Sequence, residues 1–125
     1  MLENKDAMAT IPVKDINAAR KFYEEKLHFK KSGDEGPDVV TYRNGNSTVL
    51  VYQSEFAGTN KATTATWGVG NEFDAIVREL KEAGVAFEHY DMPGAEVKGD
   101  VHRFGDFKAV WFKDPDGNIL HVNSA

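Results

Sequence analysis

The sequence predicts an α+β protein built from two copies of one unit, a strand and a helix followed by three strands. Two segments with the 3.6-residue spacing of an amphipathic helix each follow a strand-like run. Short alternating runs with turn signals follow both. Neither copy can bury its sheet alone, so we expect one pseudo-symmetric domain over residues 1–125, with modules at about 7–54 and 62–124.

Composition excludes several classes of protein. The 125 residues are 41% apolar and 28% charged, which is typical of a globular domain with a real core. No apolar run reaches the roughly 18 residues of a membrane span, and no signal peptide is evident. The formal charge is −5 with scattered Lys and Arg, which argues against nucleic acid. The absence of cysteine excludes disulfides and a thiol nucleophile, and we expect a cytoplasmic protein.

The first module begins with a strand over residues 7–13. Asp15 has the position of an N-cap. The helix that follows carries an apolar stripe at Ile16, Ala19, Tyr23 and Leu27. His28 stands where a helix commonly ends in a left-handed residue. Weaker strand patterns then cover residues 29–32, 39–43 and 48–53, with Asn44-Gly45 as a hairpin turn.

The second module repeats this plan after a polar connection. Residues 63–69 alternate as a strand, Asn71 is the expected helix cap, and Gly84 is the expected helix end. The apolar stripe of this helix is Phe73, Ile76, Val77, Leu80 and Ala83. A shift of 56 residues places Val69 on Val13, Asn71 on Asp15, Ala75 on Ala19 and Gly84 on His28. We expect a strand over residues 87–92 and a polar loop over residues 93–100.

The last stretch, residues 109–123, predicts a strand, a tight turn and a strand. Asp114-Pro-Asp-Gly117 supplies the turn. Alternation separates two faces. One face carries Val110, Phe112, Leu120 and Val122; the other carries Trp111, Ile119, His121 and Asn123.

Two of these segments resemble the vicinal oxygen chelate superfamily. They are Ile11-Pro-Val-Lys-Asp-Ile-Asn-Ala-Ala-Arg-Lys-Phe-Tyr-Glu-Glu-Lys-Leu27 and Asp114-Pro-Asp-Gly-Asn-Ile-Leu120. That group holds glyoxalases, bleomycin-resistance proteins, fosfomycin-resistance enzymes and extradiol dioxygenases. The resemblance implies two βαβββ modules whose mixed sheets curl around a shared cavity, commonly completed in a homodimer. Several chemistries share this fold, so the fold does not fix the function.

Strand parity predicts which side chains face the cavity, if the apolar faces of the strands pack on the helices. The expected cavity set is Met8, Thr10, Thr41, Arg43, Val49, Val51, Gln53, Thr64, Thr66, Trp111, His121 and Asn123. Trp67 and Tyr52 are expected to pack beneath a helix instead.

The resemblance also implies four positions for metal ligands, on the first and last strand of each module. They match Met8, Val49 or Val51, Thr64 and His121, and only His121 is a good ligand for a divalent metal. We therefore expect no metal site and no cofactor. His102, His89 or Glu55 could supply replacement ligands, although nothing in their spacing recommends them.

The predicted cavity favours a small, planar ligand. Trp111 offers a flat apolar wall and an N–H donor, or is plain core. His121 is a hydrogen-bonding partner, a catalytic general base, or a satisfied interior histidine. Arg43 anchors a carboxylate or is a solvated charge. Thr64, Thr66, Gln53 and Asn123 would add neutral donors and acceptors to the ligand site. The segment 91–102 is a lid that closes His102 onto the ligand, or a surface loop with an exposed histidine.

Three functions remain open. The leading one is a glyoxalase- or bleomycin-resistance-like small-molecule-binding protein, homodimeric and without the family metal, which sequesters its ligand or runs an acid–base reaction through His121. The second is a metal-dependent lyase or dioxygenase with a non-standard ligand set. The third is a non-catalytic association module.

Overall fold

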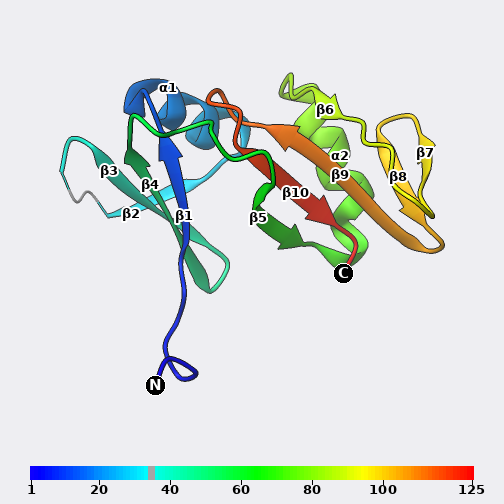
Figure 1. Ribbon diagram of the computed structural model, residues 1–125, viewed down its shortest axis with the longest axis horizontal. Helices are drawn as coiled ribbons and strands as arrows, with labels where there is room; N and C mark the ends of the chain where they lie inside the picture. The colour runs from blue at the N-terminus through cyan, green and yellow to red at the C-terminus, as the bar shows by residue number, and fades with distance from the viewer. Residues whose placement is uncertain (34–35) are drawn as a thin grey trace. The chain divides into compact units, whose positions relative to one another are not determined.

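The computed structural model describes residues 1–33 and 36–125, which divide into two units, Met1–Thr59 and Asn60–Ala125. Each unit holds helices and one mixed sheet, coloured blue to cyan-green and green to red in Figure 1. The predicted α+β class with βαβββ modules is confirmed. Within the described residues, no helix is long and apolar enough to cross a membrane.

The first unit follows the predicted order of elements. Its elements are β1 (Ala9–Val13), α1 (Ile16–Arg20), the π-helix η1 (Lys21–Lys26), β2 (Lys30–Gly33), β3 (Val39–Asn44) and β4 (Ser47–Gln53). The sheet order is β1-β4-β3-β2, with β1 parallel to β4 and the other pairs antiparallel. Gly45 takes φ 58° at the first of two turn positions between β3 and β4, where a hairpin favours glycine.

The first helix starts as the sequence predicts and then widens. Asp15 is the N-cap, and its Oδ1 accepts from the main-chain N–H groups of Asn17 and Ala18 at 2.9 and 3.2 Å. Near its end, the N–H of Leu27 donates to the carbonyl of Phe22 at 3.2 Å, five residues back. This π turn buries Phe22 beside Tyr23. The 3.6-residue pattern predicted that Tyr23 alone would be buried at that point of the helix.

The π turn also explains an error in the predicted repeat. His28 and Gly84 both end their helices with positive φ, at 60° and 86°, as the 56-residue shift predicts. Ala75, however, is exposed, whereas its predicted counterpart Ala19 is fully buried. The first helical segment holds one extra residue in its π turn. Before that turn, a buried residue of the first helix therefore corresponds to the residue 57 positions later in the chain, not 56.

The predicted face of β4 is wrong. Paired residues on neighbouring strands present their side chains on the same face. Tyr42, whose ring lies 6.3 Å from that of Tyr23 in η1, pairs with Val49, so Val49 is on the helix side. Val51 and Gln53 share this face, whereas Thr10, Thr41, Arg43, Leu50 and Tyr52 lie on the reverse. Residues 49–52 are apolar or aromatic on both faces of the strand, so the sequence could not show which of the two faces packs on the helix.

The second unit contains more strands than the sequence predicts. Its elements are β5 (Thr63–Gly68), the 3₁₀ helix η2 (Gly70–Glu72), α2 (Phe73–Glu82), β6 (Phe87–Glu88), β7 (Glu96–Lys98), β8 (Val101–Phe104), β9 (Phe107–Lys113) and β10 (Ile119–Asn123). The sheet order is β5-β10-β9-β8-β7, and β6 pairs with β9 as well. The β5–β10 pair is parallel.

Three local predictions in this unit are wrong. The strand expected over residues 87–92 is limited to Phe87–Glu88. Asn71 does not cap α2, because η2 precedes the helix and the N-cap is Glu72, without a side-chain hydrogen bond. The expected polar loop over residues 93–100 contains β7, which forms a hairpin with β8. All three residues of β7 are exposed, so no apolar alternation marked it as a strand.

The turn between β9 and β10 sets the register of the hairpin. The Asp114 side chain is buried, and its Oδ1 accepts from the N–H groups of Asp116 and Asn118 at 2.9 Å each. Its Oδ2 accepts from Nδ2 of Asn118 at 2.8 Å. These bonds hold a turn in which Trp111 pairs directly with His121.

The left-handed end of the first helix gives a testable prediction. His28 is exposed and holds φ 60°, which strains a residue with a Cβ by about 1 kcal/mol. We expect His28→Gly to raise the free energy of unfolding by about 0.5–1 kcal/mol in urea titrations. The matched change Gly84→Ala, at φ 86°, is expected to lower it by about 1 kcal/mol. Destabilisation by His28→Gly would contradict the account.

Candidate functional site

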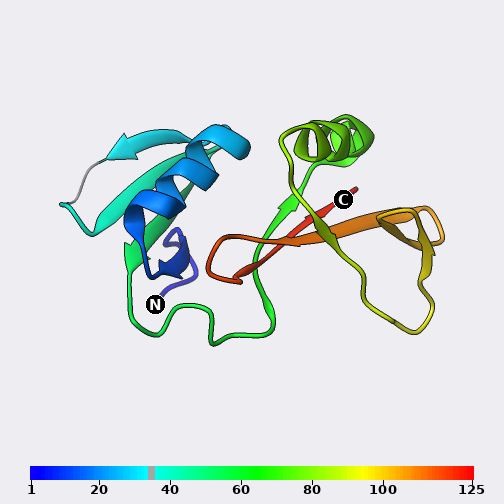
Figure 2. The ribbon, with the colours of Figure 1, turned by 90° about the horizontal axis from the view of Figure 1, so that it is seen from above.

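One face of the second unit's sheet carries no helix of that unit. Lys108 marks the opposite face, because its Nζ lies 2.9 Å from Asp74 Oδ1 and 5.6 Å from the ring centre of Phe73, both in α2. Alternation along β9 places Val110 and Phe112 with Lys108, and Ala109, Trp111 and Lys113 on the other side. Figure 2 shows α2 on one side only of β9 and β10.

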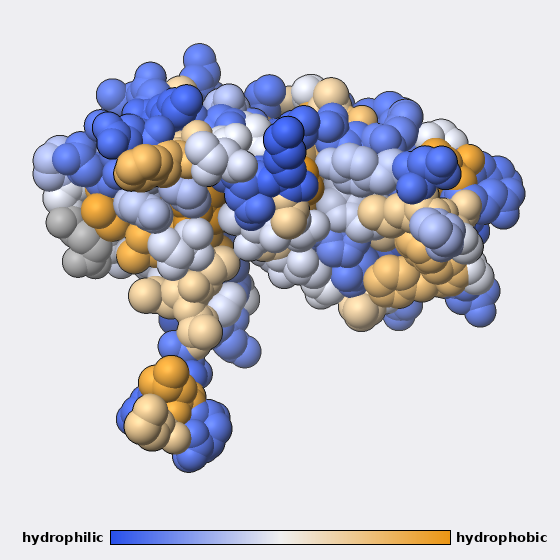
Figure 3. Space-filling view, in the orientation of Figure 1, coloured by the Kyte–Doolittle hydropathy of each residue, from blue (hydrophilic) through white to orange (hydrophobic). Residues whose placement is uncertain are grey.

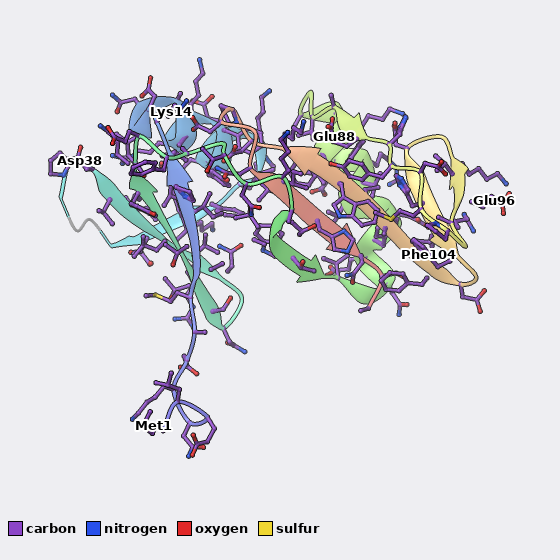
Figure 4. The ribbon with its side chains drawn as sticks, viewed as in Figure 1. Met1, Lys14, Asp38, Glu88, Glu96 and Phe104 are labelled. Atoms are coloured by element: carbon purple, nitrogen blue, oxygen red, sulfur yellow. The ribbon has the colours of Figure 1, made fainter. Side chains whose placement is uncertain are left out.

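A stacked pair of rings occupies the centre of this helix-free face. Trp111 and His121 are cross-strand partners, with ring centroids 4.4 Å apart and planes inclined by 19°. Trp111 is 8% exposed and His121 is half-buried. Trp111 also belongs to a small apolar cluster with Ala109, Ile119, Tyr90, Met92 and Phe104. Figure 4 looks onto this face, with Glu88 and Phe104 labelled towards opposite ends of β9.

A chain of three hydrogen bonds fixes the protonation of His121. The N–H of Ala125 donates to Asn123 Oδ1 at 3.0 Å, which turns the Asn123 amide nitrogen towards His121. Asn123 Nδ2 lies 3.1 Å from His121 Nε2, so Nε2 must be the acceptor. His121 Nδ1 therefore carries the proton and donates to the carbonyl of Val110 at 3.1 Å. Both ring nitrogens are occupied.

Burial keeps this imidazole neutral. It lowers the pKa of His121 below the usual 6.5; the bond to the Val110 carbonyl opposes the shift, and nearby His102 adds to it. The neutral form is therefore favoured at pH 7. This arrangement matches one of the roles that the sequence left open for His121, that of a satisfied interior histidine. A role in proton transfer would require Asn123 to give up its hydrogen bond to Nε2.

The exposed position expected for His102 is wrong. His102 lies in β8, is 0% exposed, and meets Trp111 edge-on with ring centroids 4.9 Å apart. Its Nε2 lies 2.9 Å from the main-chain N–H of Tyr90, which can only donate, and 3.2 Å from the Tyr90 carbonyl oxygen. Nδ1 is buried and has no hydrogen-bond partner among the described residues.

Tyr90 is the functional candidate that sequence reasoning passed over. Its ring lies edge-on to Trp111, with centroids 5.7 Å apart, and its hydroxyl is buried with no partner in the part of the chain that the structure describes. Burial, with Glu88 as a smaller cause, raises the pKa of Tyr90, so the hydroxyl keeps its proton. The signal was present in the alternation of Tyr90 with Met92, both of which join the Trp111 cluster.

The threonines of β5 lie on the same face of the sheet as His121. Thr66 pairs with His121 in the β5–β10 ladder and is exposed. Thr64 is two residues before Thr66, at an irregularity in the same ladder, and its hydroxyl is buried without a partner among the described residues. Both offer neutral polar groups beside the ring stack.

Two predicted ligand contacts, Arg43 and Gln53, belong to the first unit. Arg43 is exposed, and its Nε donates to the carbonyl of Gly45 at 2.9 Å. Gln53 is at the end of β4, where it lines an open depression with Lys14, Ser54 and Glu55. Gln53 and Arg43 are on opposite faces of their sheet, so the expectation that both share one cavity wall is wrong.

The side chains at the four expected metal positions do not suit a divalent metal. Val49 and Val51 are buried on the helix side of their sheet, and the residues that take the reverse face in β4 are no better as ligands. Both nitrogens of His121 are hydrogen-bonded. Within either unit, the described residues contain no group of three His, Asp or Glu side chains that could hold a metal ion.

Comparisons with known proteins agree with this fold. The profile of the Glyoxalase/Bleomycin resistance protein/Dioxygenase superfamily matches residues 7–122. A glyoxalase family protein from Enterococcus faecalis has a TM-score of 0.73 at 20% identity, over 98% of this chain and 99% of that one. Fosfomycin resistance protein FosX from Mesorhizobium loti has 0.69 at 14%, over 100% and 94%. Lactoylglutathione lyase from Agrobacterium tumefaciens has 0.69 at 15%, over 97% and 94%. No curated protein matches significantly.

The lowered pKa of His121 predicts how stability depends on pH. The unfolded chain takes up a proton near the usual pKa of 6.5, before the folded protein does. This contribution to stability is therefore complete above that value and is lost as pH falls towards the folded pKa. We expect His121→Phe to flatten the decline in unfolding free energy between about pH 7 and about pH 5, measured by urea titration. An unchanged slope would show that His121 is not held neutral.

Proposed function

Because the chain belongs to the Glyoxalase/Bleomycin resistance protein/Dioxygenase superfamily, we propose that it binds a compact, planar, partly aromatic small molecule against Trp111. The site is the helix-free face of the second unit's sheet. The observation that carries the proposal is the Trp111–His121 stack, a flat wall with its polar atoms at the edge.

The groups around the stack suit an uncharged ligand. His121 is neutral with a fixed proton, and Thr64, Thr66 and Asn123 contribute hydroxyl and amide groups. Lys113, which is on the same face, is already paired with Glu88 at 3.1 Å. A ligand held by apolar contact and a few neutral hydrogen bonds therefore fits better than a strongly charged one.

Binding without turnover is the form of this proposal that the geometry favours. A general base needs a free lone pair, and Asn123 occupies the one at Nε2 of His121. The protein accordingly acts by sequestering its ligand, with His121 as part of the wall. A homodimer and a cytoplasmic location stay predictions of the same proposal, and at most one of Arg43 and Gln53 contacts the ligand, because they lie on opposite faces of their sheet.

Replacing Trp111 tests the site directly. We expect Trp111→Ala to weaken binding of bicyclic aromatic probes such as 2-naphthol by about tenfold or more, because the main contact surface is lost. The measurement is titration calorimetry, with the retained fold checked by circular dichroism. Trp67→Phe is the matched control, because Trp67 shares the helix-side parity of Ala65 in β5 and should leave affinity unchanged. An equal loss of affinity in Trp111→Ala and Trp67→Phe would show that the helix-free face is not the binding site.

Metal content separates this proposal from the metal-dependent alternative. We expect protein purified without chelator to carry well below one divalent ion per chain, and chelation to leave its melting temperature and probe affinity unchanged, because the available side chains do not form a ligand set. Mass spectrometric metal analysis gives the answer. One tightly held ion per chain would overturn the metal-free proposal.

A further inference from the structure

Three buried polar atoms of the second unit have no hydrogen-bond partner among the described residues. They are Nδ1 of His102, the hydroxyl of Tyr90 and Oγ1 of Thr64. Such an atom destabilises the fold, and native proteins usually supply it with a partner, a water or a ligand. Two of the three belong to rings that meet Trp111 edge-on, so they lie beside the proposed binding wall.

His102 presents a defined donor at this place. Nε2 of His102 lies 2.9 Å from the main-chain nitrogen of Tyr90 and 3.2 Å from its carbonyl oxygen; because the shorter contact is with an N–H that can only donate, we assign Nε2 as the acceptor and place the proton on Nδ1. The residue is 0% exposed, and its Nδ1–H therefore lacks both protein and bulk solvent as acceptors. An oxygen atom that arrives beside it would complete an unmet hydrogen bond.

Tyr90 is anchored by its backbone but not by its side chain. Its main-chain N–H holds His102, whereas its ring is held by apolar packing on the Trp111 cluster and by ring contacts, at 5.7 Å to Trp111 and 6.3 Å to His102. Rotating the side chain outward breaks no side-chain hydrogen bond among the described residues and hydrates the hydroxyl. The cost is the loss of the aromatic and apolar contacts. The ring is thus a weakly held cover on Trp111.

The segment after Tyr90 leaves room for that rotation. Residues 89–95 belong to no strand and connect β6 with β7, and most of their side chains reach solvent. The surface beyond them is apolar, with Val97 and Phe107 substantially exposed. Figure 3 shows apolar atoms gathered over the β8–β9 end of this unit. An outward Tyr90 ring would meet solvent and this apolar surface.

We propose that Tyr90 is a gate over Trp111, and that a planar aromatic ligand bearing an uncharged carbonyl or hydroxyl oxygen takes the place of its ring. The oxygen accepts the hydrogen bond from Nδ1–H of His102. This rests on the proposed function and narrows its ligand class. A carboxylate is disfavoured, because Lys113 on this face is already paired with Glu88.

Three probes with one ring system test the ligand class on the full chain. We would titrate 2-naphthol, 2-methylnaphthalene and 2-naphthoate into Trp67→Phe protein and follow the indole N–H signal of Trp111 by ¹⁵N NMR. 2-Naphthol is expected to bind about 3- to 10-fold more tightly than 2-methylnaphthalene, the ratio that one neutral hydrogen bond supplies. 2-Naphthoate is expected to bind most weakly.

Three variants test the gate and the donor. Tyr90→Ala removes the cover and is expected to raise affinity for 2-naphthol several-fold. Tyr90→Phe removes the unpartnered hydroxyl, so it should raise the melting temperature and lower that affinity. His102→Gln keeps an acceptor for the Tyr90 N–H but loses Nδ1–H, so the preference for 2-naphthol over 2-methylnaphthalene should vanish. If His102→Gln does not fold, the comparison of 2-naphthol with 2-methylnaphthalene on protein that keeps Tyr90 tests the hydrogen-bond donor instead.

The outcomes separate this inference from the proposed function. Equal binding of 2-naphthol and 2-methylnaphthalene, lost in Trp111→Ala, would overturn the gate and donor while the Trp111 site stands. Probe binding that Trp111→Ala leaves unchanged, or no binding of any probe, would overturn the proposed function and this inference together.

Discussion

The direct pairing of Trp111 with His121 is the constraint on which the site depends. The pairing exists because the Asp114 side chain closes the turn at one register of β9 against β10. A slip of either strand by one residue would send its own ring to the α2 side of the sheet and break up the stack. Register therefore decides whether this protein has a flat aromatic wall on its helix-free face.

The hydrogen bonds around the stack give that wall its chemical character. The last residues of the chain contribute, since the Ala125 N–H orients Asn123, and Asn123 in turn sets the tautomer of His121. Burial then favours the neutral ring. The result is a stack whose own polar atoms are fixed and uncharged, although the chain carries a formal charge of −5. The charged groups on the same face, Glu88 and Lys113, are paired with each other at 3.1 Å.

The sequence predicts this site where polar and apolar residues alternate clearly. In β9 and β10, large apolar residues alternate with Trp111, His121 and Asn123, so the two faces could be told apart. In β4, Val49 to Tyr52 are apolar or aromatic on both faces, and parity gave the wrong side. His102 was misplaced for a different reason. Its partner strand β7 is exposed throughout, so nothing in the sequence showed that a hairpin buries this histidine. Protonation states and unpartnered atoms depend on three-dimensional neighbours and could not be predicted.

The tautomer of His121 tests the account most directly. The ¹⁵N chemical shifts of its ring in labelled protein near neutral pH distinguish the protonated nitrogen from the free one. The account predicts a neutral ring with the proton on Nδ1 and a lone pair on Nε2. A proton on Nε2, or a doubly protonated imidazolium, would contradict it.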